Sequence, residues 1–314
     1  MRLPTTLPLA RLLLFCSLAL VAGSLPLRAS ALVLDGESLV IEEGYPEAGP
    51  SPFPYEIVAT DSDIHVVGDG YLKPSHDVDL RGDSLLEIDT AALSRTEIRN
   101  LDVYDDSQVF LRGGSMSESG STFTFYDRSR LEIDGVVLSE TGVTLTGESA
   151  GRMSSGGLAT YAGLTVAQSA SFVMTGGFVG VGWGGLHFGG AFVEISGGQI
   201  EESALAPTGV SFDAGLARIR GGEWLFPGSF GARGWVIGDA LVEVYGTGLD
   251  ISGGRLTGTL ADGHSIDVPV EGNLQNVSFV PEPSSAVLLA LAWAAARVRR
   301  RAAWPHRALL RTAR

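Results

Sequence analysis

Two acidic clusters are the first places in the sequence where side chains could do chemistry. Asp61, Asp63 and His65 are spaced two residues apart, so a strand would place all three side chains on one face. Carboxylates and an imidazole on one face could hold a cation. The alternative, which we favour, is an exposed polar face behind the inward-pointing Ile64 and Val66.

The second cluster comprises Asp102, Asp105 and Asp106. Paired carboxylates carry acid–base chemistry in enzymes that cleave polysaccharides. A lyase would also need a basic residue, for which Arg99 and Arg112 are the nearest candidates. The chain has 36 acidic residues, so one such cluster is expected without any catalytic role, and no second motif accompanies it.

The histidines do not form a recognisable site. His187, His264 and His306 occur without a Ser-His-Asp order or an HExxH motif, and the glycine-rich segment 180–185 lacks the Asp of a calcium-binding repeat. No phosphate-binding glycine loop is present. We therefore predict no catalytic residue, no cofactor, no metal site and no enzymatic activity.

Three tryptophans leave two interpretations open. Trp183, Trp224 and Trp235 could form exposed platforms on which sugar rings stack, or they could fill the interior of the fold. We favour the second interpretation, because tryptophan is highly buried on average.

The charge of the chain is unevenly distributed. Of the 22 basic residues, three lie in 1–31 and seven in 297–314, which leaves twelve against 35 acidic residues in 32–281, a net charge of about −23. Nucleic-acid binding depends on neutralising phosphates with basic side chains. A body this acidic excludes nucleic acid as a partner and favours a soluble surface.

The N-terminus has the features of a secretory signal peptide. Arg2 and Arg11 precede the apolar stretch 12–22, and Ala29-Ser30-Ala31 fits a small-x-small cleavage site. A membrane anchor would need about 20 apolar residues. We predict a signal peptide over 1–31, cut by signal peptidase after Ala31. The only cysteine, Cys16, would leave with it.

The C-terminus combines three elements in a fixed order. The tripeptide Pro281-Glu282-Pro283 is followed by the apolar run 286–296 and by the basic cluster Arg299-Arg300-Arg301. This order resembles the PEP-CTERM sorting signal that exosortases of Gram-negative-type bacteria recognise, and it covers residues 281–301. A basic tail, 302–314, follows it. The alternatives are a plain tail anchor or a buried apolar terminus.

The resemblance implies a partner and a route. Pro281, Glu282 and Pro283 would form the tripeptide that an exosortase recognises, while Arg299, Arg300 and Arg301 hold the end of a C-terminal hydrophobic helix in the cytoplasm. The chain would contact the membrane transiently through this segment. After processing it would reach the cell surface or the extracellular matrix.

Between the termini the sequence repeats every 20–25 residues. Short alternating segments end near glycines that we align as one turn position: Gly113, Gly135, Gly156, Gly176, Gly197, Gly221 and Gly246. The copy at Gly156 is the poorest and could slip by one residue. Alternation of apolar and polar residues indicates half-buried strands. We predict an all-β protein whose residues 66–248 form a parallel β-helix, or solenoid, of about eight 20–25-residue rungs; the alternative is a β-sandwich.

Stacked rungs should align like positions. We predict inward columns formed by these residue pairs: Leu86/Ile88, Val109/Leu111, Leu131/Ile133, Phe172/Met174, Val193/Ile195, Ala217/Ile219 and Val242/Val244. On the outer side we predict Arg112 between Asp89 and Asp134, and Arg218 between Glu194 and Glu243.

Both ends of a solenoid need protection, because an open end exposes an unpaired edge. We predict an N-terminal cap over 32–65, with strands at 32–34 and 39–41 and a Pro-rich loop at 46–54. A C-terminal cap over 249–280 would contain a closing hairpin at 258–268.

These observations favour a secreted structural or adhesive protein, located at the cell surface or in an exopolysaccharide matrix, with exopolysaccharide as a further partner. The alternative is an extracellular β-helix enzyme, a lyase or hydrolase that degrades polysaccharide. An enzyme should present a groove with carboxylates from adjacent rungs and a positioned base.

Overall fold

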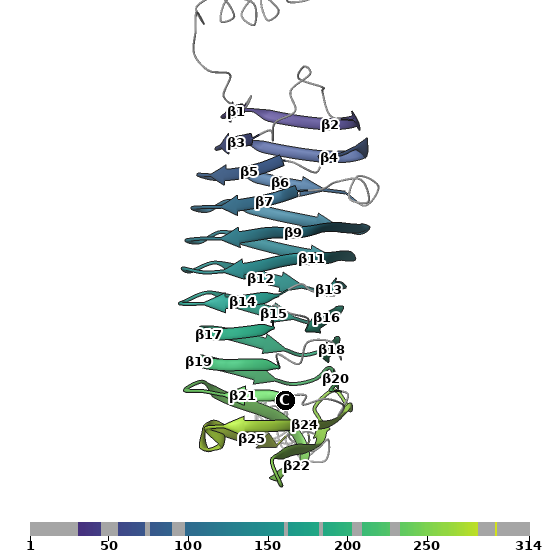
Figure 1. Cartoon of the computed structure of the whole chain (residues 1–314), viewed down its shortest axis with the longest axis vertical. Coiled ribbons are helices and arrows are strands. Elements are labelled where there is room, and N and C mark those ends of the chain that lie inside the picture. The colour runs from purple at the N-terminus through teal and green to yellow at the C-terminus, as the bar shows by residue number, and fades with distance from the viewer. Residues whose placement is uncertain are drawn as a thin grey trace, which may run out of the picture.

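The computed structural model describes residues 31–44, 56–72, 76–89, 98–159, 163–181, 185–202, 209–226, 233–281 and 293. This part of the chain is an all-β solenoid of about seven turns with rungs of about 22 residues. It forms a rod whose strands run across its long axis (Figure 1). The predicted signal helix and C-terminal hydrophobic helix lie outside the described residues, apart from Ala31 and Trp293.

The strands stack in three parallel ladders, which we call faces 1, 2 and 3. Face 1 contains β1 (Ala31–Asp35), β3 (Glu56–Thr60), β5 (His76–Arg81), β7 (Ile98–Val103), β14 (Leu164–Ala167) and β21 (Trp235–Ile237). Face 2 contains β2 (Ser38–Gly44), β4 (Asp63–Gly70), β6 (Leu85–Ile88), β8 (Gln108–Arg112), β10 (Arg130–Asp134), β12 (Ala150–Met153) and β15 (Ser171–Met174). Face 3 contains β13 (Gly156–Ala159), β16 (Phe178–Val181), β18 (Gln199–Glu202) and β20 (Glu223–Leu225).

Four longer strands continue from one face to the next. β9 (Ser115–Phe125) and β11 (Val136–Leu145) begin on face 3 and end on face 1, whereas β17 (Leu186–Ile195) and β19 (Val210–Ile219) begin on face 1 and end on face 2. Each rung therefore follows the order face 1, face 2, face 3. Along this course the strands of the inner coils pair with the coils before and after them, whereas β1, β2 and β20 each pair with one coil among the described strands.

The C-terminal end of the rod folds back on itself. An antiparallel pair is formed by β22 (Leu241–Ser252) and β23 (Arg255–Leu260). β23 also pairs antiparallel with β24 (Ser265–Gly272), so the hairpin predicted at 258–268 is present. β24 then pairs in parallel with β21, and a 3₁₀ turn (Leu274–Asn276) leads to β25 (Val277–Pro281), which pairs in parallel with β22. These two strands form the last stacked coil.

The strands predicted within the N-terminal cap over 32–65 belong to the same ladders as the rest of the rod. β1 and β2 pair in parallel with β3 and β4, so they are the first coil of the solenoid itself. The strands lie where the alternation predicts them, but alternation does not say whether the chain turns back or moves on to the next face. Residues Asp35 and Gly36 carry it round a corner to face 2. The Pro-rich loop lies outside the described residues.

The predicted core columns are confirmed. All seven inward pairs are buried. The register stacks Leu86 on Val109, Val109 on Leu131, and Phe172 on Val193. β12 supplies Gly151 between Leu131 and Phe172. Its missing side chain leaves room for neighbours, since a Cβ at Gly151 would lie 2.9 Å from Phe172 Cδ2.

The predicted glycine column is also confirmed at the corner between faces 2 and 3. Extending the register of the adjoining strands places Gly113, Gly135, Gly176, Gly197 and Gly221 on successive coils, with Ser155 in place of Gly156. The next position is also mostly glycine, and its glycines, such as Gly177, Gly198 and Gly222, have a positive φ. At Gly198 φ is +92°, and a Cβ would lie 2.6 Å from the carbonyl oxygen of Gly177 one coil away.

The outer charged column of face 2 follows the predicted register at the C-terminal end. Arg218 is paired along the ladder with Glu194 and with Glu243. The side-chain contacts are less symmetrical. Arg218 Nε lies 3.0 Å from Glu243 Oε2, whereas Glu194 contacts Arg220 at 3.5 Å.

The second predicted column also follows the predicted register, and Arg112 has a further contact with Glu87. Arg112 pairs along the ladder with Asp134, and Asp89 follows the strand β6 that precedes it. Arg112 Nη1 lies 3.0 Å from Glu87 Oε1. Its guanidinium carbon also lies 5.7 Å from the centre of the Phe110 ring.

Replacing Gly198 with alanine tests the close approach of coils at the corner between faces 2 and 3, here called the glycine corner. The matched control is Gly263→Ala, where φ is +94° and a Cβ would meet nothing within 4 Å. Both variants carry the same backbone strain, of about 1–2 kcal/mol. Only Gly198→Ala adds a backbone clash, so it should lower the melting temperature clearly more than the control. Equal losses would show that the coils tolerate a methyl group there.

Arg218→Glu tests the register of the charged column. It would place three acidic side chains on successive coils, and two lost attractions with two new repulsions should cost about 1–2 kcal/mol at low salt. Arg218→Gln, which removes the charge without reversing it, should cost about half. Both losses should shrink in high salt. An unchanged melting temperature for Arg218→Glu at low salt would contradict this register.

Candidate functional site

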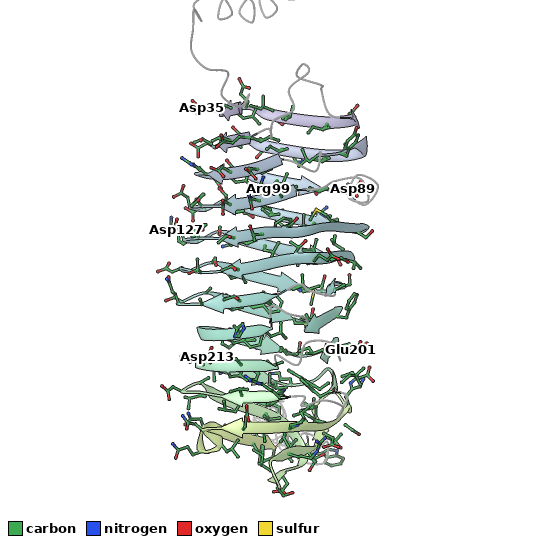
Figure 2. The ribbon with its side chains drawn as sticks, viewed as in Figure 1. Asp35, Asp89, Arg99, Asp127, Glu201 and Asp213 are labelled. Carbon is green, nitrogen blue, oxygen red and sulfur yellow. The ribbon has the colours of Figure 1, made fainter. Side chains whose placement is uncertain are left out.

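The corner between faces 1 and 2, here called the first corner, is built from residues with positive φ on successive coils. They are Gly36 (66°), Asp61 (49°), Gly82 (68°), Asp105 (58°), Asp127 (53°), Gly147 (70°) and Gln168 (56°). This conformation favours Gly and, among other residues, Asp and Asn. Asp35, Asp127 and Asp213 lie along this edge of the rod (Figure 2).

The aspartates of the first corner hydrogen-bond to neighbouring coils. The backbone N–H of Asp83 donates to Asp61 Oδ1 at 2.9 Å, and the N–H of Gly82 donates to Asp105 Oδ2 at 2.8 Å. The N–H of Asp105 donates in turn to Asp127 at 3.4 Å. These carboxylates therefore satisfy backbone donors that the turn leaves unpaired.

A buried serine follows the corner residue on five successive coils: Ser62, Ser84, Ser107, Ser129 and Ser149. The N–H of Ser62 donates to Ser84 Oγ at 3.1 Å, and Ser84 Oγ donates to the carbonyl of Arg81 at 2.6 Å. We did not predict this serine column from the sequence. Its signal is an Asp or Gly, usually two residues before a Ser, repeated about every 22 residues.

The first predicted cluster makes separate contacts. Asp61 turns the corner, Asp63 is exposed, and His65 Nδ1 lies 3.1 Å from Glu87 Oε2 on the next coil. Ile64 and Val66 are buried behind them, as the favoured interpretation expected.

The second predicted cluster does not converge either. Asp102 points outward from β7 and stacks on Asp79, whereas Asp105 belongs to the first corner. Asp106 accepts two hydrogen bonds from Arg128, at 2.7 and 2.6 Å, which lower the pKa of its carboxyl. Arg99 is exposed on β7. In the described residues, no group of three or more His, Cys, Asp or Glu side chains could hold a metal ion.

Of the three tryptophans singled out in the sequence, the two that the structure describes fill the interior. Trp224 and Trp235 are 5% and 0% exposed, and their rings pack edge to face at 4.8 Å. Trp183 lies outside the described residues. His187 is exposed on β17, His264 Nδ1 lies 2.9 Å from Asp262 Oδ2, and His306 lies outside the described residues.

The predicted sorting signal begins where the described solenoid ends. Pro281 is exposed and is the last residue of β25, paired along the ladder with Gly246. Glu282, Pro283 and the basic cluster 299–301 lie outside the described residues, as does Ala29 of the predicted cleavage site. Among the described residues no helix has the length and apolar character needed to cross a membrane.

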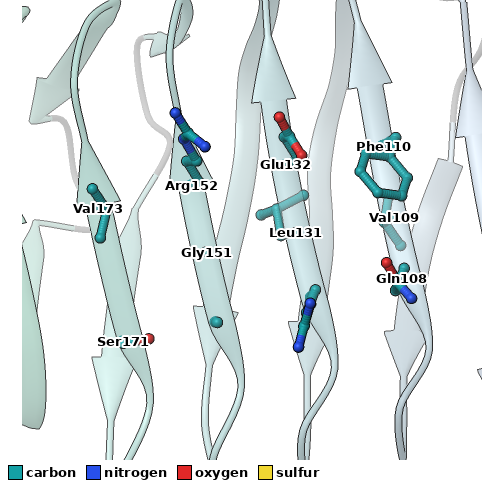
Figure 3. A pocket seen from close by; sticks show the side chains of 11 residues that line it. Gln108, Val109, Phe110, Leu131, Glu132, Gly151, Arg152, Ser171 and Val173 are labelled. Atoms are coloured by element: carbon teal, nitrogen blue, oxygen red, sulfur yellow. The ribbon is translucent and has the colours of Figure 1, made fainter.

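The strongest candidate for a binding site is a shallow groove on face 2. It has a volume of about 390 Å³ and crosses four successive strands, β8, β10, β12 and β15 (Figure 3). The residues that line it are Gln108, Val109, Phe110, Arg130, Leu131, Glu132, Ala150, Gly151, Arg152, Ser171 and Val173. We call it the face-2 groove.

Register explains why the outer surface is hollowed there. Gln108, Arg130, Ala150 and Ser171 occupy one outward column, and Phe192 follows them on the next coil. Two successive small side chains in this column leave a depression between larger neighbours. The parallel column, which contains Phe110, Glu132, Arg152 and Val173, forms its other side.

The face-2 groove has a distinct electrostatic character. Among the described residues, no carboxylate lies within ion-pair distance of Arg130 or Arg152. The nearby Asp134 instead accepts hydrogen bonds from Ser154 and Ser155, at 2.9 and 2.7 Å. These bonds, with smaller effects of Arg112 and Arg152, lower the pKa of its carboxyl. The two arginines therefore offer their guanidinium donors to solvent or a ligand.

Asp79 and Asp102 stack on neighbouring coils as outward residues of face 1. Their proximity gives a pH-dependent prediction. Burial of the carboxyl, followed by the charges of Asp79 and Asp77, raises the pKa of Asp102. Its protonated form therefore favours folding, and stability is lost as the pH rises through the folded-state pKa. Asp102→Asn imitates the protonated form, so it should melt at a higher temperature than the native sequence at pH 7 and at the same temperature near pH 3.

Asp106→Asn is the matched control for this prediction. Because Arg128 lowers the pKa of Asp106, its ionised form favours folding at neutral pH. This variant should melt at a lower temperature than the native sequence at pH 7. If Asp102→Asn also lowers the melting temperature at pH 7, the burial of Asp102 and its repulsion by Asp79 and Asp77 do not destabilise the folded state.

Comparison of the chain with protein-family models, with curated proteins and with solved structures finds no match.

Proposed function

We propose that this β-solenoid protein is secreted, sorted by an exosortase to the cell surface or its exopolysaccharide matrix, and acts there as a structural or adhesive protein without enzymatic activity. Signal peptidase would remove residues 1–31, and the exosortase would act at the tripeptide of residues 281–283. The chain would contact the membrane only until that step.

One observation carries the proposal: the tripeptide, the apolar run and the basic cluster follow one another in the order of a sorting signal. The end of the fold is compatible with this role. Pro281 is exposed, and no side chain of β25 is fully buried. β25 pairs with β22 alone among the described strands, so a processing enzyme could reach the tripeptide without opening the core.

A structural or adhesive role is supported by the contacts of the acidic side chains. Asp61, Asp105 and Asp127 accept backbone hydrogen bonds at the first corner, and Asp106 is paired with Arg128. The face-2 groove contains one carboxylate, Glu132, whereas most glycoside hydrolases use two. One observation favours the alternative of a polysaccharide-degrading enzyme: a second cavity, of about 340 Å³, brings Asp105, Asp127 and Glu148 of three successive coils together with Arg128. Because Asp105 and Asp127 accept backbone hydrogen bonds there, we favour the structural or adhesive role.

Replacing Pro281, Glu282 and Pro283 together with alanine tests the sorting step. We expect the variant to be exported and folded but retained with the inner-membrane fraction, whereas the native chain reaches the surface or medium. Glu271→Ala is a matched control that removes one exposed acidic residue from β24 and should leave delivery unchanged. Normal surface delivery of the triple variant would refute exosortase sorting.

A further inference from the structure

The geometry points to the face-2 groove as a binding site for an acidic oligosaccharide, with Arg130 and Arg152 holding its carboxylates and Phe110 packing against a sugar ring. This inference deepens the adhesive role proposed above by naming the class of ligand. It requires neither sorting nor cleavage, so the two proposals fail in different experiments.

The face-2 groove differs in charge from the rest of the rod. The body of the chain has a net charge of about −23, yet the face-2 groove carries two arginines and one glutamate. Neither arginine is engaged in an ion pair in the part of the chain that the structure describes. Guanidinium groups bind carboxylates through two parallel hydrogen bonds. The groove is therefore a local anion site on an acidic rod.

The spacing of the two arginines follows from the register. Arg152 lies on the strand next to that of Arg130 and two residues further along, since Arg130 stacks on Ala150 and Glu132 on Arg152. Strand spacing and rise per residue place their Cα atoms about 8 Å apart. Two long side chains at this distance can converge on one carboxylate or hold the carboxylates of neighbouring sugar units.

The lining of the face-2 groove is mixed in character. Phe110 stands at one side of the groove (Figure 3), and the apolar C–H face of a sugar ring can pack against such a ring. Gln108, Ser171 and Glu132 supply hydrogen-bond donors and acceptors for hydroxyl groups. The small side chain of Ala150 leaves space for a ligand between the strands of Arg130 and Ser171. An acidic sugar presents the matching combination of carboxylate, hydroxyls and an apolar face.

The position of the groove within the sheet favours a sugar over an acidic peptide. Peptides often bind to sheets by adding a strand to an open edge, but β8, β10, β12 and β15 are interior strands paired on both sides. Their backbone groups are therefore occupied, and recognition must come from side chains. Nucleic acid is disfavoured by the acidic body.

The test uses the purified full chain in detergent micelles and two acidic probes, oligogalacturonate and alginate oligomers, measured by titration calorimetry. Methyl-esterified oligogalacturonate is the matched neutral ligand, and polyglutamate represents an acidic peptide. We expect at least one acidic oligomer to bind, its esterified form and polyglutamate to bind at least about tenfold more weakly, and added salt to weaken binding.

Variants locate the site. Arg130→Gln with Arg152→Gln should weaken binding by at least about tenfold, and Phe110→Ala should weaken it by a smaller factor. The control, Arg99→Gln with Arg233→Gln, removes two exposed arginines elsewhere and should bind normally. All variants should keep the melting temperature of the native chain to within a few degrees, because the replaced side chains point outward.

Four results would overturn the inference. They are no binding of either acidic oligomer, equal binding of the esterified ligand, equal binding of polyglutamate, and an equal loss in the control variant. The variant with alanine at residues 281–283 should still bind the acidic oligomer. If it binds but is not sorted, the sorting step and the binding site are shown to be independent.

Discussion

Each rung must return to the same path one strand spacing further along the rod, because the strands make their backbone hydrogen bonds with the coils before and after them. The observed offsets between stacked residues range from 20, between Leu131 and Gly151, to 26, between Gly44 and Gly70, and reach 35 in the last coil, between Val242 and Val277, where the hairpin is inserted. Rung length therefore varies, while the strands of faces 1 and 2 stay in register. The constraint falls on the corners, which must turn the chain identically on successive coils.

The two best-defined corners meet this constraint with different chemistry, and this accounts for much of the composition. At the glycine corner, between faces 2 and 3, most coils approach too closely for a side chain, as at Gly197 and Gly198. At the first corner, Asp side chains accept backbone N–H groups of adjacent coils and serines are buried beneath them. Much of the acidity that could suggest catalysis or metal binding is structural. The face-2 groove is the exception, since its charged groups make no such contacts.

Several features of the fold could be predicted because they repeat within the sequence. Inward pairs such as Leu86/Ile88 and glycines such as Gly113 reveal both the period and the register. The first corner was not predicted, because either Asp or Gly can occupy its turn position, so no single residue type repeats in the sequence. The parallel pairing of the N-terminal coil could not be predicted, because alternation around Asp35 indicates strands but not the strands with which they pair. The face-2 groove could not be predicted, since it arises only when Ala150 and Ser171 stack between larger residues that are far apart in sequence.

The register of the coils is the central claim, and engineered disulfides test it most directly. Cys16 is the only cysteine, so a Cys16→Ser background is free of thiols. Thr144 stacks on Thr165, which stacks on His187, so Thr144 lies about 4.8 Å from Thr165 and about twice that from His187. Cysteines whose Cα atoms are more than 7 Å apart cannot be bridged without backbone movement. Thr144→Cys with Thr165→Cys should therefore form a disulfide under mild oxidation, whereas Thr144→Cys with His187→Cys should stay reduced; the opposite result would contradict the register.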